Sequence, residues 1–224
     1  HISWVILTGE FAYKIKKPVD FGFLDFSTLE KRQHYCHQEL ELNRKLAPGI
    51  YLDVVAITNT SASPKISGDG EVIDYAVKMR QFPQSAQMDN MLAAGELNTE
   101  HMKAVADLIA NFHQAIHVAD NSTDYGEINT LFQPVLENFS QIKPHLDSNM
   151  HKEALSSLEA WSQLQHKKLS VVFKQRKRDG FVRECHGDLH LRNLIWLDDL
   201  PLAFDCIEFN PSLHWIDVIS EVAF

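Results

Sequence analysis

Apolar and polar residues alternate at the start of the chain. Residues 1–17 place β-branched and aromatic side chains around Thr8-Gly9-Glu10, a pattern that predicts two strands joined by a tight turn. Successive side chains of a strand point to opposite faces. In the second strand, one face therefore carries Ala12, Lys14 and Lys16, and the other carries Phe11, Tyr13 and Ile15. We expect the first face to carry charge and the second to pack.

A helix and further strands follow this hairpin. Ser27-Thr28-Leu29-Glu30 has the spacing of a capping box, with Ser27 as the cap, and predicts a helix to about Leu46. Residues 50–58 and 71–79 are apolar, β-rich stretches separated by a Ser/Pro/Gly-rich segment. Together these elements predict a small sheet of at least four strands with one helix.

Helical periodicity dominates the rest of the chain. A helix is expected behind an Asn98 cap, a second from near Pro134, and a third from about His151 toward Gly180. The apolar stripe of the first contains Met102, Val105, Ala106, Leu108, Ile109, Phe112 and Ile116. The stripe of the third contains Leu155, Leu158, Trp161, Leu164, Val172 and Phe173. The chain is therefore expected to be α+β, with a β-rich part before a helical part.

Composition narrows the class of protein. The 224 residues include 21 basic and 30 acidic side chains, a formal charge of −9, and 45% are hydrophobic. Disorder and a membrane span are therefore poor interpretations, and the acidic excess disfavours binding to nucleic acid. Three widely spaced cysteines, Cys36, Cys185 and Cys206, predict neither a disulfide framework nor a zinc site. We expect a cytoplasmic protein.

Both ends of the chain interrupt a pattern. The chain begins at His1 within a predicted strand, and residues 215–224 stop within a predicted helix. We therefore expect a fragment that lacks both ends of a longer domain.

Residues 185–209 contain a second predicted hairpin. Residues 194–197 and 202–205 are short apolar strands, joined by a turn at residues 198–201. Pairing Leu197 with Leu202 sets Leu194 opposite Asp205. Asn193 and Asp205 would then lie at the same open end of the hairpin.

Asp188 lies in the loop that leads to this open end, five positions before Asn193. Two carboxylates and an amide oxygen form the oxygen-rich environment that Mg²⁺ prefers, with phosphate oxygens and water as further ligands. The chemistry that this indicates is phosphoryl transfer, in which a carboxylate accepts the proton of an attacking hydroxyl.

The spacing of these residues resembles a known family. His186-Gly187-Asp188, with Asn193 five positions after the aspartate and Asp205 twelve positions further, is similar to the catalytic and metal loops of the aminoglycoside phosphotransferase and choline kinase group, relatives of the protein kinases. The resemblance implies ATP and Mg²⁺ as cofactors. It implies that Asp188 is the catalytic base and that Asn193 and Asp205 bind the metal.

The same resemblance implies a protein-kinase-like two-lobe fold. Residues 1–79 would form the N-lobe, residues 80–83 the hinge and residues 84–224 the helical C-lobe. The backbone of the hinge segment Met79, Arg80, Gln81 and Phe82 would hold adenine. His186, Glu208 and Asp217, the last in the next helix, would support the catalytic and metal loops.

The N-terminal hairpin agrees with this resemblance. Residues 11–14, Phe-Ala-Tyr-Lys, are similar to the V-A-I-K strand of kinases, whose lysine binds the α and β phosphates and pairs with a helix glutamate. This implies that Lys14 binds phosphate and that Glu39 positions it. Lys16 shares the face of Lys14 and remains a rival. The glycine-rich loop of the family would precede residue 1.

The implied function is ATP-dependent phosphorylation of a hydroxyl on a small molecule, such as an aminoglycoside, amino alcohol, sugar or related metabolite. No nucleic acid or membrane partner is expected. Some bacterial relatives join such a domain to a C-terminal P-loop domain, so such a domain beyond Phe224 is a further expectation.

Two other interpretations remain open. One is a kinase fold that binds ATP as a regulatory module without transferring phosphate. The other is a metal-dependent hydrolase that uses His186, Asp188 and His190, which alternate as i, i+2 and i+4. His113 and His117 have the spacing of helical zinc ligands, but the glutamate of an HExxH motif is absent between them, and packing is the expected role.

Overall fold

The computed structural model describes residues 2–60 and 63–224 of a mixed α+β chain, so the expectations for His1, Ser61 and Ala62 lie outside the described residues. The chain divides into two compact units. The first unit consists of residues up to 115, residues 186–214 and residue 224; the second consists of residues 116–185 and 215–223. The lobe boundary expected at residues 80–83 stays a prediction.

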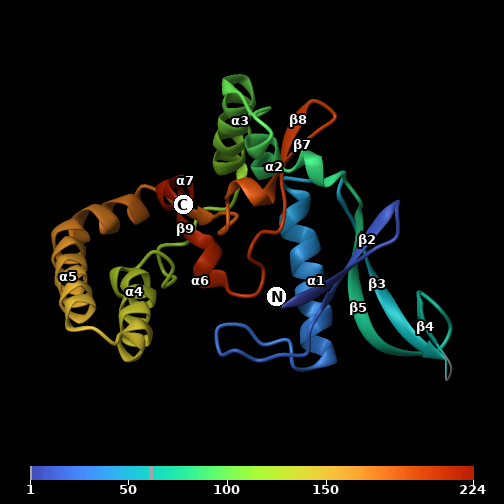
Figure 1. Ribbon diagram of the computed structural model, residues 1–224, viewed down its shortest axis with the longest axis horizontal. Helices are drawn as coiled ribbons and strands as arrows, with labels where there is room; N and C mark the ends of the chain where they lie inside the picture. The colour runs from blue at the N-terminus through green and yellow to red at the C-terminus, as the bar shows by residue number, and fades with distance from the viewer. Residues whose placement is uncertain (1, 61–62) are drawn as a thin grey trace. The chain divides into compact units, whose positions relative to one another are not determined.

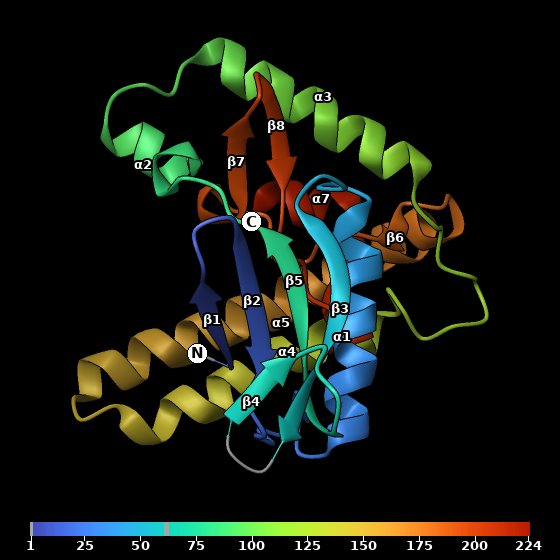
Figure 2. The ribbon, with the colours of Figure 1, turned by 90° about the vertical axis from the view of Figure 1, so that its right-hand side faces the viewer.

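A five-stranded antiparallel sheet forms much of the first unit (Figures 1 and 2). Its strands along the chain are β1 (Ser3–Leu7), β2 (Phe11–Lys16), β3 (Tyr51–Thr60), β4 (Ser63–Ile66) and β5 (Glu71–Arg80). Their spatial order is β1-β2-β5-β3-β4. The N-terminal hairpin and the two later strands were expected. The short strand β4 was missed because its exposed residues, Ser-Pro-Lys-Ile, read as part of a loop.

Helix α1 (Leu29–Arg44) packs against β3 and β5 (Figure 2). Its cap is Thr28, whose hydroxyl accepts the Lys31 N–H at 3.3 Å, and not Ser27 as expected. The Ser27 hydroxyl instead donates to Asp25 Oδ1 at 2.6 Å. Because this local bond removes Ser27 from capping, the helix begins one residue later than the capping-box pattern indicates.

The face of β2 that carries Lys14 and Lys16 is the packed face, so the expectation that charge lies on one face and packing on the other was wrong. Ala12 and Lys16 are buried, and Lys14 is nearly so. The reason is that α1 brings a buried acid, Glu39, to this face, and paired charges can be buried where single charges cannot.

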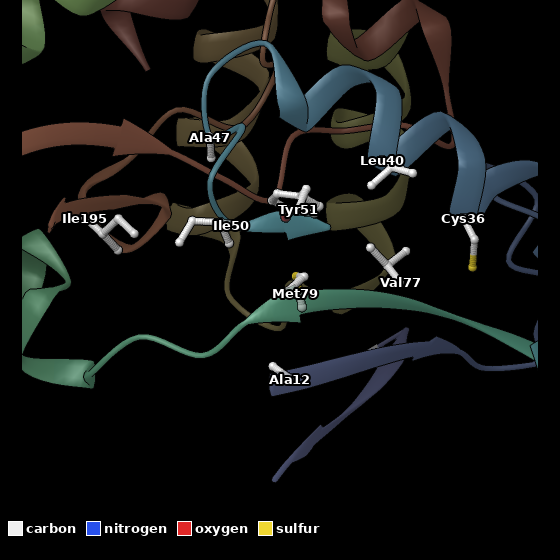
Figure 3. Close-up of a cluster of buried hydrophobic side chains, with 9 residues drawn as sticks. All are labelled: Ala12, Cys36, Leu40, Ala47, Ile50, Tyr51, Val77, Met79 and Ile195. Carbon is white, nitrogen blue, oxygen red and sulfur yellow. The ribbon is translucent and has the colours of Figure 1, made fainter. Parts of the chain in front are cut away.

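A cluster of buried hydrophobic side chains in the first unit connects the sheet, α1 and a second hairpin (Figure 3). Its members are Ala12, Cys36, Leu40, Ala47, Ile50, Tyr51, Val77, Met79 and Ile195. Ile195 has no exposed surface and belongs to β7 (Leu194–Leu197), far from the others in sequence. The packing therefore fixes the hairpin that leads to Asp205 against the sheet.

That hairpin pairs β7 with β8 (Leu200–Ala203) in a register that differs from the expected one. Leu197 pairs with Leu200, not Leu202, because Asp198 and Asp199 take positive φ values of 52° and 60° and form a two-residue turn. The shift of two residues leaves each side chain on its expected face. Asp205 consequently lies two residues beyond the end of β8, still at the open end of the hairpin.

Three more helices complete the first unit: α2 (Met88–Ala93), α3 (Thr99–Ala115) and α6 (Pro211–His214). As expected, Asn98 caps α3, since its Oδ1 accepts the N–H groups of Glu100 and His101. Figure 2 shows α3 beside the β7–β8 hairpin, and α3 contacts β8. The buried residues of α3 are Val105, Ile109 and Phe112.

The second unit is mainly helical. Its elements are α4 (Ile128–Ile142), α5 (Asn149–Arg178), α7 (Val218–Ala223) and the paired strands β6 (Val182–Glu184) and β9 (Trp215–Asp217). Pro134 lies inside α4 and does not begin it, so the amphipathic pattern of this helix outweighs the preference of proline for a first turn. The apolar stripe expected on α5 is largely exposed, including Leu158 and Trp161.

None of the helices in the described part of the chain combines the length and the apolar character needed to cross a bilayer.

Candidate active site

Two lysines of β2 meet one glutamate of α1. Lys14 Nζ lies 2.7 Å from Glu39 Oε1, and Lys16 Nζ lies 2.7 Å from Glu39 Oε2. The Glu39 side chain has no exposed surface. The contact expected between Lys14 and Glu39 is therefore present, and Lys16 shares the same partner.

Each lysine also contacts an acid of the loop that follows β8. Lys14 Nζ bonds to Asp205 Oδ1, and Lys16 Nζ bonds to Glu208 Oε1. The exposed fractions separate the two lysines, since the Lys14 side chain is 13% exposed and that of Lys16 is fully buried. Only Lys14 is accessible to a ligand.

The charged groups of this cluster shift one another's pKa values. Burial alone would lower the pKa of Lys14, but Asp205 and Glu39 raise it well above its ordinary value. Burial would raise the pKa of Glu39 and of Asp205, yet the neighbouring lysines, Lys14 foremost, hold both below their ordinary values. Burial raises the pKa of Glu208 despite its contact with Lys16. Lys14, Glu39 and Asp205 are consequently ionised at neutral pH.

Helix α1 buries Glu39 together with other polar side chains. Arg32, Glu39 and Asn43 are all buried. Arg32 Nε donates to Asp74 Oδ1 at 2.8 Å, and Asn43 Nδ2 donates to the Glu39 carbonyl at 2.8 Å. These partners make the burial of polar groups tolerable, because a buried polar group is costly only when it lacks a hydrogen bond.

The loop that carries Asp205 is held in an unusual backbone conformation. Asp205 has φ 63°, a left-handed value that costs of order 1–3 kcal/mol for such a residue. The Tyr51 hydroxyl accepts the Asp205 N–H at 3.0 Å, and Asn43 Oδ1 accepts the Cys206 N–H at 3.0 Å. These two side chains therefore fix where the carboxylate of Asp205 points.

The loop from His186 to Asp188 lies against the same segment. His186 Nε2 lies 2.9 Å from the Phe204 carbonyl, and its Nδ1 accepts the Asp188 N–H at 3.3 Å, which assigns the ring proton to Nε2. Gly187 has φ 85°, and a Cβ at this position would lie 2.7 Å from the Leu213 carbonyl oxygen. Only glycine fits here.

Asn193 orients Asp188. Its Nδ2 donates to the Asp188 carbonyl and to Asp188 Oδ2, both at 2.9 Å. Asn193 ends a short 3₁₀ turn, Leu191–Asn193, directly before β7, and it is buried. Its amide nitrogen is thus committed to Asp188, which leaves the amide oxygen as the atom that could bind a metal.

Two cavities of the first unit share Lys14 and Asp205 in their walls. One, of about 510 Å³, is lined by apolar residues of β1 and β2 and by the expected hinge residues Met79, Arg80, Gln81 and Phe82. The other, of about 380 Å³, is lined by Asp188 and Glu208 among others. The first has the size and the apolar walls of a site for a planar ring, and the second has the carboxylates of a cation site.

The backbone of the expected hinge is partly engaged already. The Arg80 N–H donates to the Ile50 carbonyl at 2.8 Å, and the Gln81 N–H donates to the Glu10 carbonyl at 2.9 Å. Gln81 Oε1 also accepts the Gly9 N–H at 3.1 Å. The two bonds of Gln81 tie the segment to the first hairpin, and Phe82 is the next residue with a backbone N–H.

The donor set fits a magnesium ion. Asp205 keeps 46% of its side chain exposed, and Asp188 keeps 36%. Both line the smaller cavity, and Asn193 is bonded to Asp188. Carboxylate and amide oxygens beside open volume suit a hard ion that retains several waters.

The geometry does not favour the two metal sites that would use histidines. Both ring nitrogens of His186 are engaged, so neither can bind a metal, and His190 Nε2 lies 3.6 Å from Asp188 Oδ2. This geometry argues against a His186, Asp188 and His190 centre. Helix α3 ends at Ala115, so His117 is not one helical turn from His113, and its Nδ1 lies 3.2 Å from Glu184 Oε2.

Asp217 belongs to the second unit. It is the last residue of β9, not a helix residue as expected, and its carboxylate receives two bonds from Arg176, at 2.6 and 2.8 Å. The Ile219 N–H also donates to it at 2.9 Å. Its expected support of the catalytic loop stays a prediction.

The three cysteines are buried, unpaired thiols. Burial raises the pKa of each of them. A thiol that stays protonated is a poor nucleophile, so cysteine chemistry is not indicated.

Sequence reasoning missed three residues of the site. It considered Lys16 only as a rival for phosphate, and it gave no role to Tyr51 or Asn43. Tyr51 and Asp205 are 154 positions apart, and Asn43 and Cys206 are 163 apart. The one available signal was the pair of lysines on a single face of β2, which indicates either an exposed strand or two buried acceptors.

Comparisons with known proteins found relatives of the chain but nothing that identifies its chemistry. No family model and no solved structure matches it. Curated proteins from Mycobacterium bovis and from two strains of Mycobacterium tuberculosis, each described as uncharacterized, are 29% identical to it over 224 residues, the whole of this chain. The chain spans 43% of the length of each of these relatives.

Proposed function

We propose that this chain is an ATP-dependent phosphotransferase that phosphorylates a hydroxyl group of a small molecule, with Mg²⁺ as cofactor, and that its arrangement is that of a two-lobe, kinase-like fold. One observation carries the proposal. Lys14, paired with Glu39, meets Asp205 at the wall shared by an apolar cavity and a carboxylate-lined cavity.

The two cavities suit the two parts of a nucleotide. The apolar cavity accommodates a base between the hinge residues and β1, and Phe82 is among the residues that line it. The neighbouring cavity accommodates phosphates, with Lys14 between the two. An ammonium group with a pKa well above its ordinary value stays charged against phosphate at any physiological pH.

Asp188 is the base in this proposal. Asn193 holds Asp188 Oδ2, which turns the carboxylate toward the cavity that Asp205 also lines. Asp188 accepts the proton of the acceptor hydroxyl while the new oxygen–phosphorus bond forms and the bond to the ADP oxygen breaks. Asp205 and Asn193 would hold Mg²⁺, which supplies charge neutralisation of the phosphates when bound.

Lys14 and Asp205 neutralise each other in the structure. In the proposed function the nucleotide phosphates replace Asp205 as the partner of Lys14, while Glu39 keeps the ammonium in position. Because each group already faces an opposite charge, Lys14 is positioned for an anionic phosphate and Asp205 for a cationic metal ion.

A thermal-shift titration with ATP, with and without Mg²⁺, tests the proposal. We compare the wild type with Asp205→Asn, because asparagine tolerates the φ of 63° that alanine would not. Asp199→Asn is the matched control, an exposed turn aspartate at φ 60°. Stabilisation by Mg²⁺ and ATP together that only Asp205→Asn loses is the expected result. No response to nucleotide in the folded wild type would overturn the proposal.

Transfer itself is tested with a panel of aminoglycosides, amino alcohols and sugars in the presence of Mg-ATP. Asp188→Ala is expected to lower turnover by about 10²- to 10⁴-fold, the usual contribution of a general base. Nucleotide binding without transfer to any acceptor would instead favour the regulatory ATP-binding module.

A further inference from the structure

Lys16 is the fully buried lysine of the cluster. Its side chain has no exposed surface, and its Nζ lies 4.8 Å from the centre of the Phe26 ring. Unlike Lys14, it lines neither of the two cavities. A nucleotide in those cavities therefore cannot reach it, and its role must be exerted through its partners.

Those partners connect three segments of the chain. The ion pairs run from Asp205 to Lys14, from Lys14 to Glu39, from Glu39 to Lys16, and from Lys16 to Glu208. Because Glu208 follows Asp205 by three residues, the series closes on itself through the backbone. We call these five residues the charge ring.

Glu39 is held at both of its carboxylate oxygens. One carboxylate oxygen contacts Lys14 and the other contacts Lys16. A carboxylate held at a single oxygen can rotate, whereas one held at both oxygens by different strand residues cannot rotate without breaking a contact. Lys16 therefore sets the direction from which Glu39 meets Lys14.

We propose that Lys16 is a positioning residue of the phosphotransferase site: through Glu39 and Glu208 it couples α1 to the loop of Asp205, so that Lys14 and Asp205 are in place before nucleotide binds. This inference rests on the proposed function. Movement of α1 away from the sheet would separate Glu39 from Lys14 only by also breaking a fully buried pair with Lys16. The site is thus assembled in advance and is not switched by displacement of this helix.

A purely structural role for Lys16 makes a different prediction. The ring has two positive and three negative members, so Lys16→Met alone leaves unpaired buried acid and destabilises the fold under either explanation. Lys16→Met combined with Glu208→Met removes the pair together and replaces it with apolar volume, which commonly restores stability. If Lys16 only balances charge, activity should return with stability. If it positions Glu39, activity should not return.

The experiment measures urea unfolding and the hydrolysis of Mg-ATP by the wild type, the single variant and the double variant. We expect the double variant to unfold near the wild-type midpoint, with kcat lowered about 10- to 100-fold, the cost of a misplaced group, and KM for ATP within about threefold. Lys17→Met is the control, since Lys17 follows Lys16 in the chain but lies over the Trp4 ring. Full recovery of kcat in the double variant would overturn the proposal.

A second measurement separates this inference from the proposed function. The rate at which an amine-reactive reagent modifies Lys14 is read by mass spectrometry without nucleotide, with Lys17 as the internal reference. We expect modification of Lys14 to be at least about fivefold faster in the double variant, because a freed Glu39 no longer holds the ammonium. An unchanged rate refutes the coupling even if ATP binds, and a wild type that ignores Mg-ATP refutes the function even if the rate changes.

Discussion

Tyr51→Phe removes a single oxygen atom from the centre of the first unit. The Tyr51 side chain is 1% exposed, and its hydroxyl accepts the N–H of Asp205 at 3.0 Å. Phenylalanine fills the same volume, so the core around Ile50 and Met79 should stay packed. The substitution therefore isolates the contribution of one hydrogen bond to the position of Asp205.

The expected loss in the free energy of unfolding follows from the Asp205 N–H, which loses its acceptor. An unpaired buried donor costs about 1–3 kcal/mol. The Asp205 side chain is 46% exposed, so water can partly replace the lost acceptor, and we expect the lower half of that range, about 1–1.5 kcal/mol. The backbone around the left-handed Asp205 also loses one of the two side-chain acceptors of its N–H groups, which leaves Asn43 on the Cys206 N–H.

Urea unfolding followed by circular dichroism measures the change. Tyr13→Phe is the matched control, because Tyr13 lies on the opposite face of β2 and loses the same atom. We expect a lower midpoint for Tyr51→Phe at an unchanged slope, and a weakened response to Mg-ATP. A free energy of unfolding within about 0.3 kcal/mol of the wild-type value, well below the cost of an unpaired donor, would refute the idea that Tyr51 holds this loop.

The remaining predictions concern the loop, the charges and the core. Gly187→Ala should cost more than about 2 kcal/mol, from a left-handed backbone and the contact with the Leu213 carbonyl, and should abolish the Mg-ATP shift; thermal unfolding that matches the wild type would contradict this. Glu39 and Asp205 have lowered pKa values, so the native state binds fewer protons than the unfolded state. The stability that they supply is complete above the ordinary carboxyl range, near pH 4, and is lost as pH falls through their folded values. Urea midpoints should therefore be alike at pH 7 and 5 and fall at pH 4 and 3, and less so in Glu39→Gln; a wild-type profile that stays flat down to pH 3 would be inconsistent with ionised buried acids. Ile195→Ala should cost about 2–5 kcal/mol by chemical unfolding, as expected for a side chain with no exposed surface, and a cost below about 1 kcal/mol would mean that the hairpin does not pack on the sheet.

Sequence patterns correctly predicted the elements whose formation depends on residues close together in the chain. The hairpin turn at Thr8-Gly9-Glu10, helix α3 behind Asn98 and the long helix α5 all agree with the expected positions. Each depends on residues within a few positions of one another, such as a glycine in a turn or a side chain at a helix cap. The errors at Ser27 and Pro134 were also local, where two short-range preferences competed.

The β7–β8 hairpin shows how far such reasoning extends. The predicted register was wrong by two residues, because Asp198 and Asp199 adopt a left-handed backbone conformation that the prediction did not assign to them. The open end nevertheless carries Asn193 and Asp205 as expected, since a shift of two preserves the face of each side chain. The predicted placement of these two residues therefore did not depend on the exact register.

The sequence by itself predicted which residues could carry the proposed chemistry: Asp188, Asn193 and Asp205 by their spacing, and Lys14 with Glu39 by the resemblance to the lysine strand and helix glutamate of kinases. Only the tertiary structure decided which lysine faces the cavities and which is sealed behind Glu39. It also revealed the hold of Tyr51 on Asp205, a contact across 154 positions. The physical reason is that periodicity reports the face of an element, whereas the partner of a buried charge is set by which distant segment packs against that face.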